Sequence, residues 1–137
     1  MDTKRLVIGT LVGGIILYAL GYLIFDLAFA DFYAANTGSA TGVERNPQVV
    51  WAVVLGTLSY AALVTLGIGS RSSSSNVEAG VKVGAVVGFL LWFTVDFILY
   101  GITNVGNLTR TVVDPLLELV RGGIAGGVIA VALGKIR

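Results

Sequence analysis

Four long apolar stretches alternate with polar segments along the chain. They cover approximately residues 6–28, 49–68, 82–102 and 115–134. A helix needs about 20 apolar residues to cross the hydrocarbon core of a bilayer, and each stretch is long enough to do so. The pattern therefore predicts an all-α fold, an integral membrane four-helix bundle that forms a single transmembrane domain over residues 1–137.

The two prolines give a further prediction about where helices begin. Pro47 follows Asn46, and Pro115 follows Asp114. A capping side chain followed by proline at the first helical position is a typical start signal. This spacing predicts that the second and fourth helices begin at these two sites.

Composition supports the membrane prediction and excludes several kinds of chemistry. Of 137 residues, 55% are hydrophobic and 12% charged, with a mean hydropathy of +0.89, whereas soluble domains average about 25% charged residues. The chain has no cysteine and no histidine. We therefore expect no disulfide, no metal site, no cofactor and no catalytic residue of these types. A net charge of +1 without a basic run predicts no nucleic-acid partner.

The basic residues are distributed unevenly between the two sides of the predicted membrane. Arg45 and Arg110 fall on one side. Six others fall on the opposite side: Lys4, Arg5, Arg71, Lys82, Lys135 and Arg137. Because loops rich in lysine and arginine remain in the cytoplasm, we predict a cell membrane protein, in a plasma or inner membrane, with both termini and the serine-rich loop cytoplasmic.

The two halves of the chain share several positions, which suggests duplicated helical hairpins. A shift of 70 residues places Gly14 on Gly84 and Asp26 on Asp96. Such a duplication would relate the hairpins by an axis along the membrane normal. The alternative is that two apolar hairpins resemble each other through composition alone.

Glycines recur at a spacing that places them on one face of a helix. Such strips let helix backbones approach closely inside a membrane, where packing replaces the hydrophobic effect. They serve either packing within one bundle or a contact between identical copies. The residues are Gly80, Gly84, Gly88, Gly122, Gly123 and Gly126.

Asp96 is a carboxylate inside an otherwise apolar stretch. Counting about 1.5 Å per residue from the predicted helix ends places Asp96 and Arg121 at similar depths in the outer half of the membrane. An unpaired charge at that depth would cost several kcal/mol or more. We therefore expect Asp96 to pair with Arg121.

Other polar and aromatic side chains fall near the same level. They form either a buried structural network that fixes helix register, or the lining of an outward-open pocket for a small polar or cationic ligand. Tyr22 and Trp92 are candidates for a ligand wall. The full set is Asp26, Asp96, Tyr100, Glu118, Arg121, Tyr22, Trp92 and Asn104.

One resemblance agrees with this architecture. The run DFILYGITNVGNLT followed by VVDPL, after GVKVGAVVG, is similar to small four-helix prokaryotic membrane proteins of uncharacterised function. The likeness extends to FDLAFADFYAAN and VVWAVVLGTLSY and so covers most of the chain. It implies the four-helix fold and brings no activity with it.

Two functions follow from this pattern. The first is a non-enzymatic membrane protein that binds a small ligand or a protein partner through its outer charged cluster. The alternative is a small transporter or channel that acts as a homo-oligomer. Paired carboxylates such as Asp96 and Glu118 permit acid–base chemistry, but no nucleophile–base motif accompanies them. The expected partners are the lipid bilayer and a second copy or another membrane protein.

Overall fold

The computed structural model describes residues 1–70 and 76–136, and within these residues it is helical, with no β-strand. The all-α prediction is confirmed, and four helical segments are long and apolar enough to cross a membrane. Arg71, Arg137 and residues 72–75 of the serine-rich loop, used above for orientation, lie outside the described residues. The elements are α1 (Thr3–Gly21), the π-helix η1 (Tyr22–Ala28), α2 (Ala30–Ala35), α3 (Val50–Gly69), α4 (Val77–Ile102) and α5 (Leu108–Gly134).

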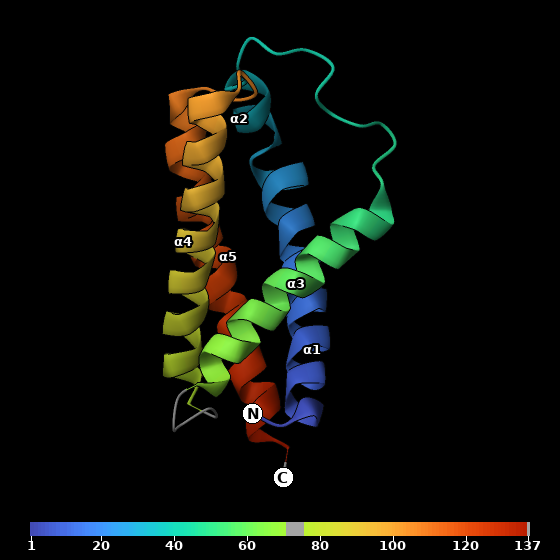
Figure 1. Cartoon of the computed structure of the whole chain (residues 1–137), viewed down its shortest axis with the longest axis vertical. Helices are drawn as coiled ribbons and strands as arrows, with labels where there is room; N and C mark the ends of the chain where they lie inside the picture. The colour runs from blue at the N-terminus through green and yellow to red at the C-terminus, as the bar shows by residue number, and fades with distance from the viewer. Residues whose placement is uncertain (71–75, 137) are drawn as a thin grey trace.

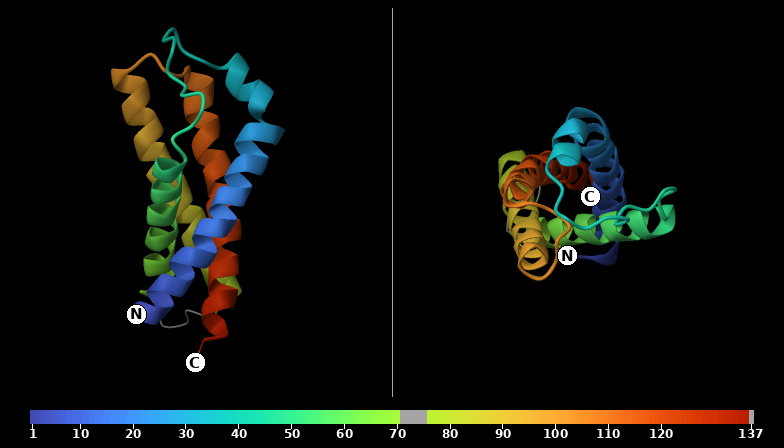
Figure 2. Two further views of the ribbon diagram at one scale, coloured as in Figure 1. Left: turned by 90° about the vertical axis from the view of Figure 1, so that its right-hand side faces the viewer. Right: turned by 90° about the horizontal axis from the view of Figure 1, so that it is seen from above.

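The helices form an elongated bundle with both termini at one end (Figure 1). α4 and α5 lie side by side along its length, and α1 runs beside α5. α3 crosses the bundle obliquely and extends outward away from the termini, as the view from above in Figure 2 shows. α2 and the segment after it lie over the end opposite the termini, which we call the cap end. Near the cap end the interior is therefore surrounded by η1, α2, α4 and α5, because the first half of α3 extends away from the bundle.

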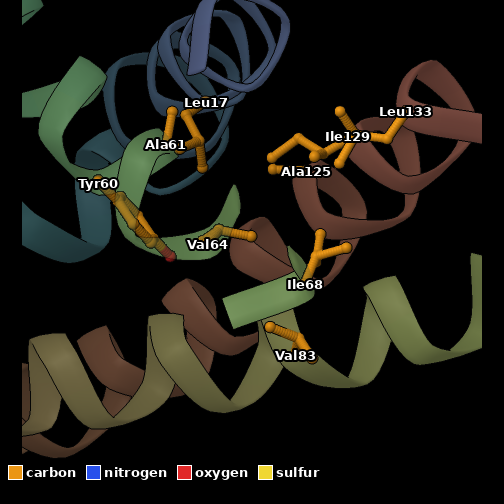
Figure 3. Close-up of a cluster of buried hydrophobic side chains, with 9 residues drawn as sticks. All are labelled: Leu17, Tyr60, Ala61, Val64, Ile68, Val83, Ala125, Ile129 and Leu133. Carbon is orange, nitrogen blue, oxygen red and sulfur yellow. The ribbon is translucent and has the colours of Figure 1, made fainter. Parts of the chain in front are cut away.

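The apolar core lies in the half of the bundle nearer the termini. α3 contributes Tyr60, Val64 and Ile68, which face Leu17 of α1 and Ile129 of α5 (Figure 3). All of these side chains are buried. The first turns of α3 are exposed instead, and Trp51 has 72% of its surface accessible. α3 is therefore anchored through its second half.

Asparagine caps, rather than prolines, mark the starts of α4 and α5. Asn76 Oδ1 accepts a hydrogen bond from Ala79 N at 3.2 Å, and Asn107 Oδ1 accepts one from Arg110 N at 2.9 Å. These bonds satisfy backbone donors that have no partner at a helix start. Pro115 lies inside α5, seven residues after Leu108. The prediction that Pro115 opens the last helix is therefore wrong.

Pro47 does not open a helix either. The bond between Asn46 and Pro47 is cis, and α3 begins three residues later, at Val50. Val49 precedes this helix without a side-chain cap. The proline lies instead in the long connection between α2 and α3.

Glycines bring the backbones of α4 and α5 into contact. A Cβ atom on Gly80 would lie 2.5 Å from the carbonyl oxygen of Gly126, and one on Gly84 would overlap the carbonyl of Gly122. Only a residue without a side chain permits such an approach. The space at Gly123 is less tight, because a Cβ there would lie 3.5 Å from Ala85 Cβ. The strip on α4 therefore faces α5 inside the same chain.

The two hairpins pack differently. α4 and α5 remain together along their length, whereas α3 crosses α1 and leaves it. Gly14 lies at this crossing, where an added Cβ would lie 2.7 Å from Leu58 Cδ2. Duplication of the hairpins stays a hypothesis, since this difference in packing does not favour it.

Candidate functional site

One face of α5 carries a column of charged side chains. Arg110, Asp114, Glu118 and Arg121 follow one another at spacings of four, four and three residues. Residues at these spacings are neighbours on a helix surface. The column begins near the cap end and continues inward to Arg121, which lies 13 residues after Leu108, a rise of about 20 Å.

The inner half of this column is a buried ion pair. Arg121 Nη1 donates a hydrogen bond to Glu118 Oε1 at 2.8 Å, and the two side chains are 9% and 2% exposed. Arg121 also donates from Nε and Nη2 to the carbonyl oxygen of Leu17, at 3.0 and 2.6 Å. A buried charge needs such partners because it has lost its hydration. Arg121 therefore joins α5 to α1.

Two aromatic rings lie beside the Arg121 guanidinium. The Phe25 and Tyr60 ring centres are 5.5 and 5.8 Å from its central carbon. Both distances are within the range of a cation–π contact. The Tyr60 hydroxyl also donates to the backbone carbonyl of Glu118 at 3.5 Å. Elements α3, α5 and η1 thus meet around one positive charge.

The change from α1 to the π-helix η1 lies next to Arg121. Phe29 N donates to Ile24 O at 2.8 Å, which is the five-residue hydrogen bond of a π-helix. Gly21 precedes η1, and a Cβ there would lie 2.7 Å from Arg121 Nη2. A larger residue would collide with the guanidinium that bonds to Leu17. Gly21 therefore permits the close approach between Arg121 and α1.

The outer half of the column is a carboxyl pair below α2. Asp96 of α4 lies beside Asp114, close enough for the two carboxyl groups to interact. The Tyr33 hydroxyl of α2 donates to Asp114 Oδ1, and the Arg110 guanidinium lies over the Tyr33 ring, 5.0 Å from its centre. Burial, followed by the hydrogen bond to Asp114, raises the pKa of Tyr33 well above its ordinary value. Its hydroxyl therefore stays protonated, and can donate, at neutral pH.

A small cavity connects the carboxyl pair with the cap end. It has a volume of about 50 Å³ and is lined by polar and apolar residues of α4, α5 and the loop between them. Such a volume accommodates one or two water molecules. The lining includes Asp96, Tyr100, Thr103, Gly106, Arg110 and Thr111.

Three buried polar atoms in this region have no hydrogen-bond partner within the described chain. They are Trp92 Nε1, Asp96 Oδ2 and Glu118 Oε2. Glu118 is 2% exposed, so its free oxygen is fully enclosed. Unsatisfied buried polar atoms are few in native proteins and call for an explanation. Their concentration along one interior face marks this column as the candidate site.

The predicted pairing of Asp96 with Arg121 is wrong. The glycine contacts set Gly84 opposite Gly122, and this antiparallel register places Arg121 opposite Ala85. Asp96 is 11 residues from Ala85 along α4, which is about 16 Å. Arg121 pairs instead with Glu118 on its own helix. The start of α5 lies seven residues before the predicted start, and this accounts for about 10 Å of the error.

The remaining predicted site residues divide between the interior and the surface. Trp92 packs against the core beside the column, and Tyr100 lines the cavity with 45% of its surface exposed. Tyr22 is 54% exposed and Asp26 is also exposed. Asn104 is exposed, and its backbone carbonyl accepts a hydrogen bond from Ala40 N at 3.0 Å. Tyr22, Asp26 and Asn104 are therefore not brought to the column.

The structure adds four residues that the sequence analysis did not select as site candidates. Asp114 could have been found from its four-residue spacing to Glu118, and Arg110 from its four-residue spacing to Asp114. Tyr33 and Tyr60 approach the column from elements distant in sequence. Their approach depends on tertiary packing, for which the chain contains no local signal.

Comparison with protein-family models, with curated proteins and with solved structures finds no match to this chain.

Proposed function

We propose that this multi-pass membrane protein binds one small cation, about the size of a water molecule, at the column on α5. The ligand enters from the cap end and reaches the carboxyl pair formed by Asp96 and Asp114. The protein acts as a binding protein and catalyses no reaction. The alternatives considered from sequence, a protein partner and transport by an oligomer, have less support from the described residues.

The observation that supports this proposal most is the charge of the column. The column holds the carboxyl groups of Asp114 and Glu118 and the guanidinium groups of Arg110 and Arg121, and the carboxyl group of Asp96 on α4 lies against it. Three negative and two positive charges sum to one negative charge. An uncompensated charge inside a membrane protein is costly. One added positive charge makes the column neutral.

The size and position of the cavity limit which cation can enter. A site for a drug-sized ligand has a volume of about 300–1,000 Å³, whereas this cavity has about 50 Å³. Its lining includes Asp96 and the hydroxyl-bearing residues Thr103 and Thr111. These groups can accept hydrogen bonds from a small cation. The site therefore suits a proton or a small monovalent ion.

The interior beyond Arg121 supports binding rather than passage across the membrane. Toward the termini, the buried polar side chains of the described residues are limited to Thr65. Its hydroxyl already donates to Ala61 O at 2.7 Å. A cation would meet the fixed charge of Arg121 and then an apolar core. This is the arrangement of a site with one entrance.

We propose further that the protein lies in a cell membrane with both termini in the cytoplasm. The termini are at the same end of the bundle (Figure 1). Lys4, Arg5, Lys82 and Lys135 belong to this end, and the distribution of basic residues favours its cytoplasmic placement. The site then opens to the outer side.

The experiment measures thermal unfolding of the purified protein in detergent, with pH and the concentrations of Na⁺, K⁺ and ammonium varied one at a time. A cation that binds the folded state raises its stability, and the gain grows with the logarithm of its free concentration once that exceeds the dissociation constant. We expect stabilisation by a lower pH or by one of these ions. Asp96→Asn, which removes the entrance carboxylate, should abolish it.

The matched control is Glu78→Gln, at an exposed acidic residue near the opposite end of α4 whose partner is Lys82 at 2.5 Å. This variant should respond to pH and to salts as the original protein does. An identical response of Asp96→Asn and the original protein to all four variables would refute the proposal.

A further inference from the structure

We propose that the bound cation is a proton shared between Asp96 and Asp114. This inference rests on the function proposed above and names its ligand. It follows from the chemistry of two carboxyl groups in contact, from the buried oxygens without partners and from the size of the cavity beside them.

Contact between two carboxylates needs a proton. Ionised carboxylates only accept hydrogen bonds, yet the carboxyl groups of Asp96 and Asp114 lie beside each other and Asp96 Oδ2 is buried. Asp96 Oδ2 is buried and has no partner within the described chain. Protonation turns the Asp96 carboxyl group into a donor toward Asp114. The same step removes the repulsion between two like charges in a medium of low dielectric constant.

The transfer balances without any further reactant. A hydronium ion in the cavity gives up one proton, and an O–H bond forms on the Asp96 carboxyl group. The hydronium ion becomes water, which the cavity of about 50 Å³ can contain. The column changes from one negative charge to neutral. Asp114 remains the acceptor of hydrogen bonds from both Asp96 and Tyr33.

The Tyr33 hydroxyl assigns the proton to Asp96 rather than to Asp114. A hydrogen bond donated to a carboxylate favours its ionised form. Tyr33 donates such a bond to Asp114, while Asp96 Oδ2 receives none. Tyr33 is therefore a positioning residue, which keeps Asp114 as the acceptor.

A metal ion is a weaker candidate on geometric grounds. Hard cations need about six or more oxygen ligands arranged around one point. In the part of the chain that the structure describes, no three acidic side chains converge in that way. A proton needs only one acceptor and satisfies an atom that is otherwise unpaired.

The charged and titratable groups around the pair come from several elements. α5 contributes Arg110, Glu118 and Arg121 besides Asp114, and α2 contributes Tyr33. α3 contributes Tyr60, which faces Glu118. Glu118 has its own partner in Arg121. Among the described residues no ion pair includes Asp96 or Asp114, although the charge of Arg110 favours the ionised form of Asp96, and this distinguishes the pair from the inner ion pair.

The test is infrared difference spectroscopy of the full chain in detergent as the pH is lowered at constant salt. A protonated carboxyl group gives a carbonyl band that shifts in D₂O. We expect such a band in the original protein, and a further shift when all aspartates contain ¹³C in the carboxyl group. The isotope experiment needs no substitution, so it remains decisive if a variant does not fold.

Variants then locate the proton. Asp96→Asn and Asp114→Asn should each abolish the band, whereas the control Glu78→Gln, at an exposed residue far from the column, should retain it. A band that is unaffected by aspartate labelling, or lost in Glu118→Gln alone, would overturn the assignment to this pair. A third outcome separates the two proposals. If Na⁺ or ammonium stabilises the protein in a way that depends on Asp96, and no aspartate band appears, then the ligand is not a proton but the cation site remains.

Discussion

Replacement of Arg121 by methionine tests the buried hydrogen bonds and ion pair through which Arg121 joins α1 to α5. The substitution keeps a long side chain and removes the charge together with three hydrogen bonds, one to Glu118 and two to the Leu17 carbonyl. Glu118, 2% exposed, is then left without its positive partner. Breaking a buried pair in this way costs about 3–5 kcal/mol. We expect the free energy of unfolding of Arg121→Met to fall by about that amount.

A double-mutant cycle separates the pair from other effects of the substitution. Glu118→Gln leaves Arg121 as the unpaired buried charge, so it should also destabilise the fold by about 3–5 kcal/mol. The double variant removes both charges and leaves neither isolated. Its loss should therefore be smaller than the sum of the single losses, by up to about 3 kcal/mol for residues in contact.

The measurement is reversible unfolding in mixed detergent micelles, followed by near-ultraviolet circular dichroism. Glu78→Gln is the control, because Glu78 and Lys82 form an exposed pair of the same chemistry. Exposed pairs contribute little to stability, so no measurable change is expected there. Additive losses in the cycle, or a loss at Arg121 no larger than at Glu78, would show that the pair does not determine the packing of α1 on α5.

Gly84→Leu should lower the unfolding temperature in detergent, because the new side chain would meet the backbone of α5. Gly101→Leu is the control and should not lower it, since no atom lies within 4 Å of the Cβ position at Gly101. Equal unfolding temperatures of the two variants would contradict the contact between α4 and α5. The pKa of Tyr33 is raised in the folded state, so the neutral phenol stabilises the fold. This contribution to the free energy of unfolding is complete below about pH 10, the ordinary pKa of tyrosine, and is lost as the pH rises above that value. Tyr33→Phe should flatten this alkaline decline in chemical unfolding, and an unchanged decline would contradict it. Ser39→Cys should react with an impermeant thiol reagent on intact cells and Lys135→Cys should not; the reverse labelling would invert the orientation.

The apolar pattern predicted the four spans but not where two of them begin. α4 starts with Val77, Glu78, Ala79 and Gly80, and α5 with a turn that contains Arg110. These first turns are too polar to be recognised as part of a membrane span from hydrophobicity alone. Their helical state comes from side-chain capping by Asn76 and Asn107. Hydrophobicity therefore reports what lies in lipid and misses the turns that extend beyond it.

The sequence analysis named part of the charged column but mistook the pairing within it. The sequence identified Asp96, Glu118 and Arg121 as buried charges, and all three lie along one interior face. Which of them meet depends on helix register, and contacts such as Gly84 against Gly122 set that register at the level of single atoms. A depth estimate cannot resolve this. The three-residue spacing of Glu118 and Arg121 was the more reliable signal, because it depends only on local helix geometry.

The location of the Glu118–Arg121 pair within one helix has a consequence for biogenesis. A helix that entered the bilayer with one of these charges alone would bear a penalty of several kcal/mol. Because the partners are three residues apart, the ion pair needs no second helix to form. α5 can therefore partition into lipid as an electrically neutral segment. The two bonds from Arg121 to the Leu17 carbonyl then form only on docking, so α5, which follows α1 in the chain, secures α1 after it has entered the bilayer.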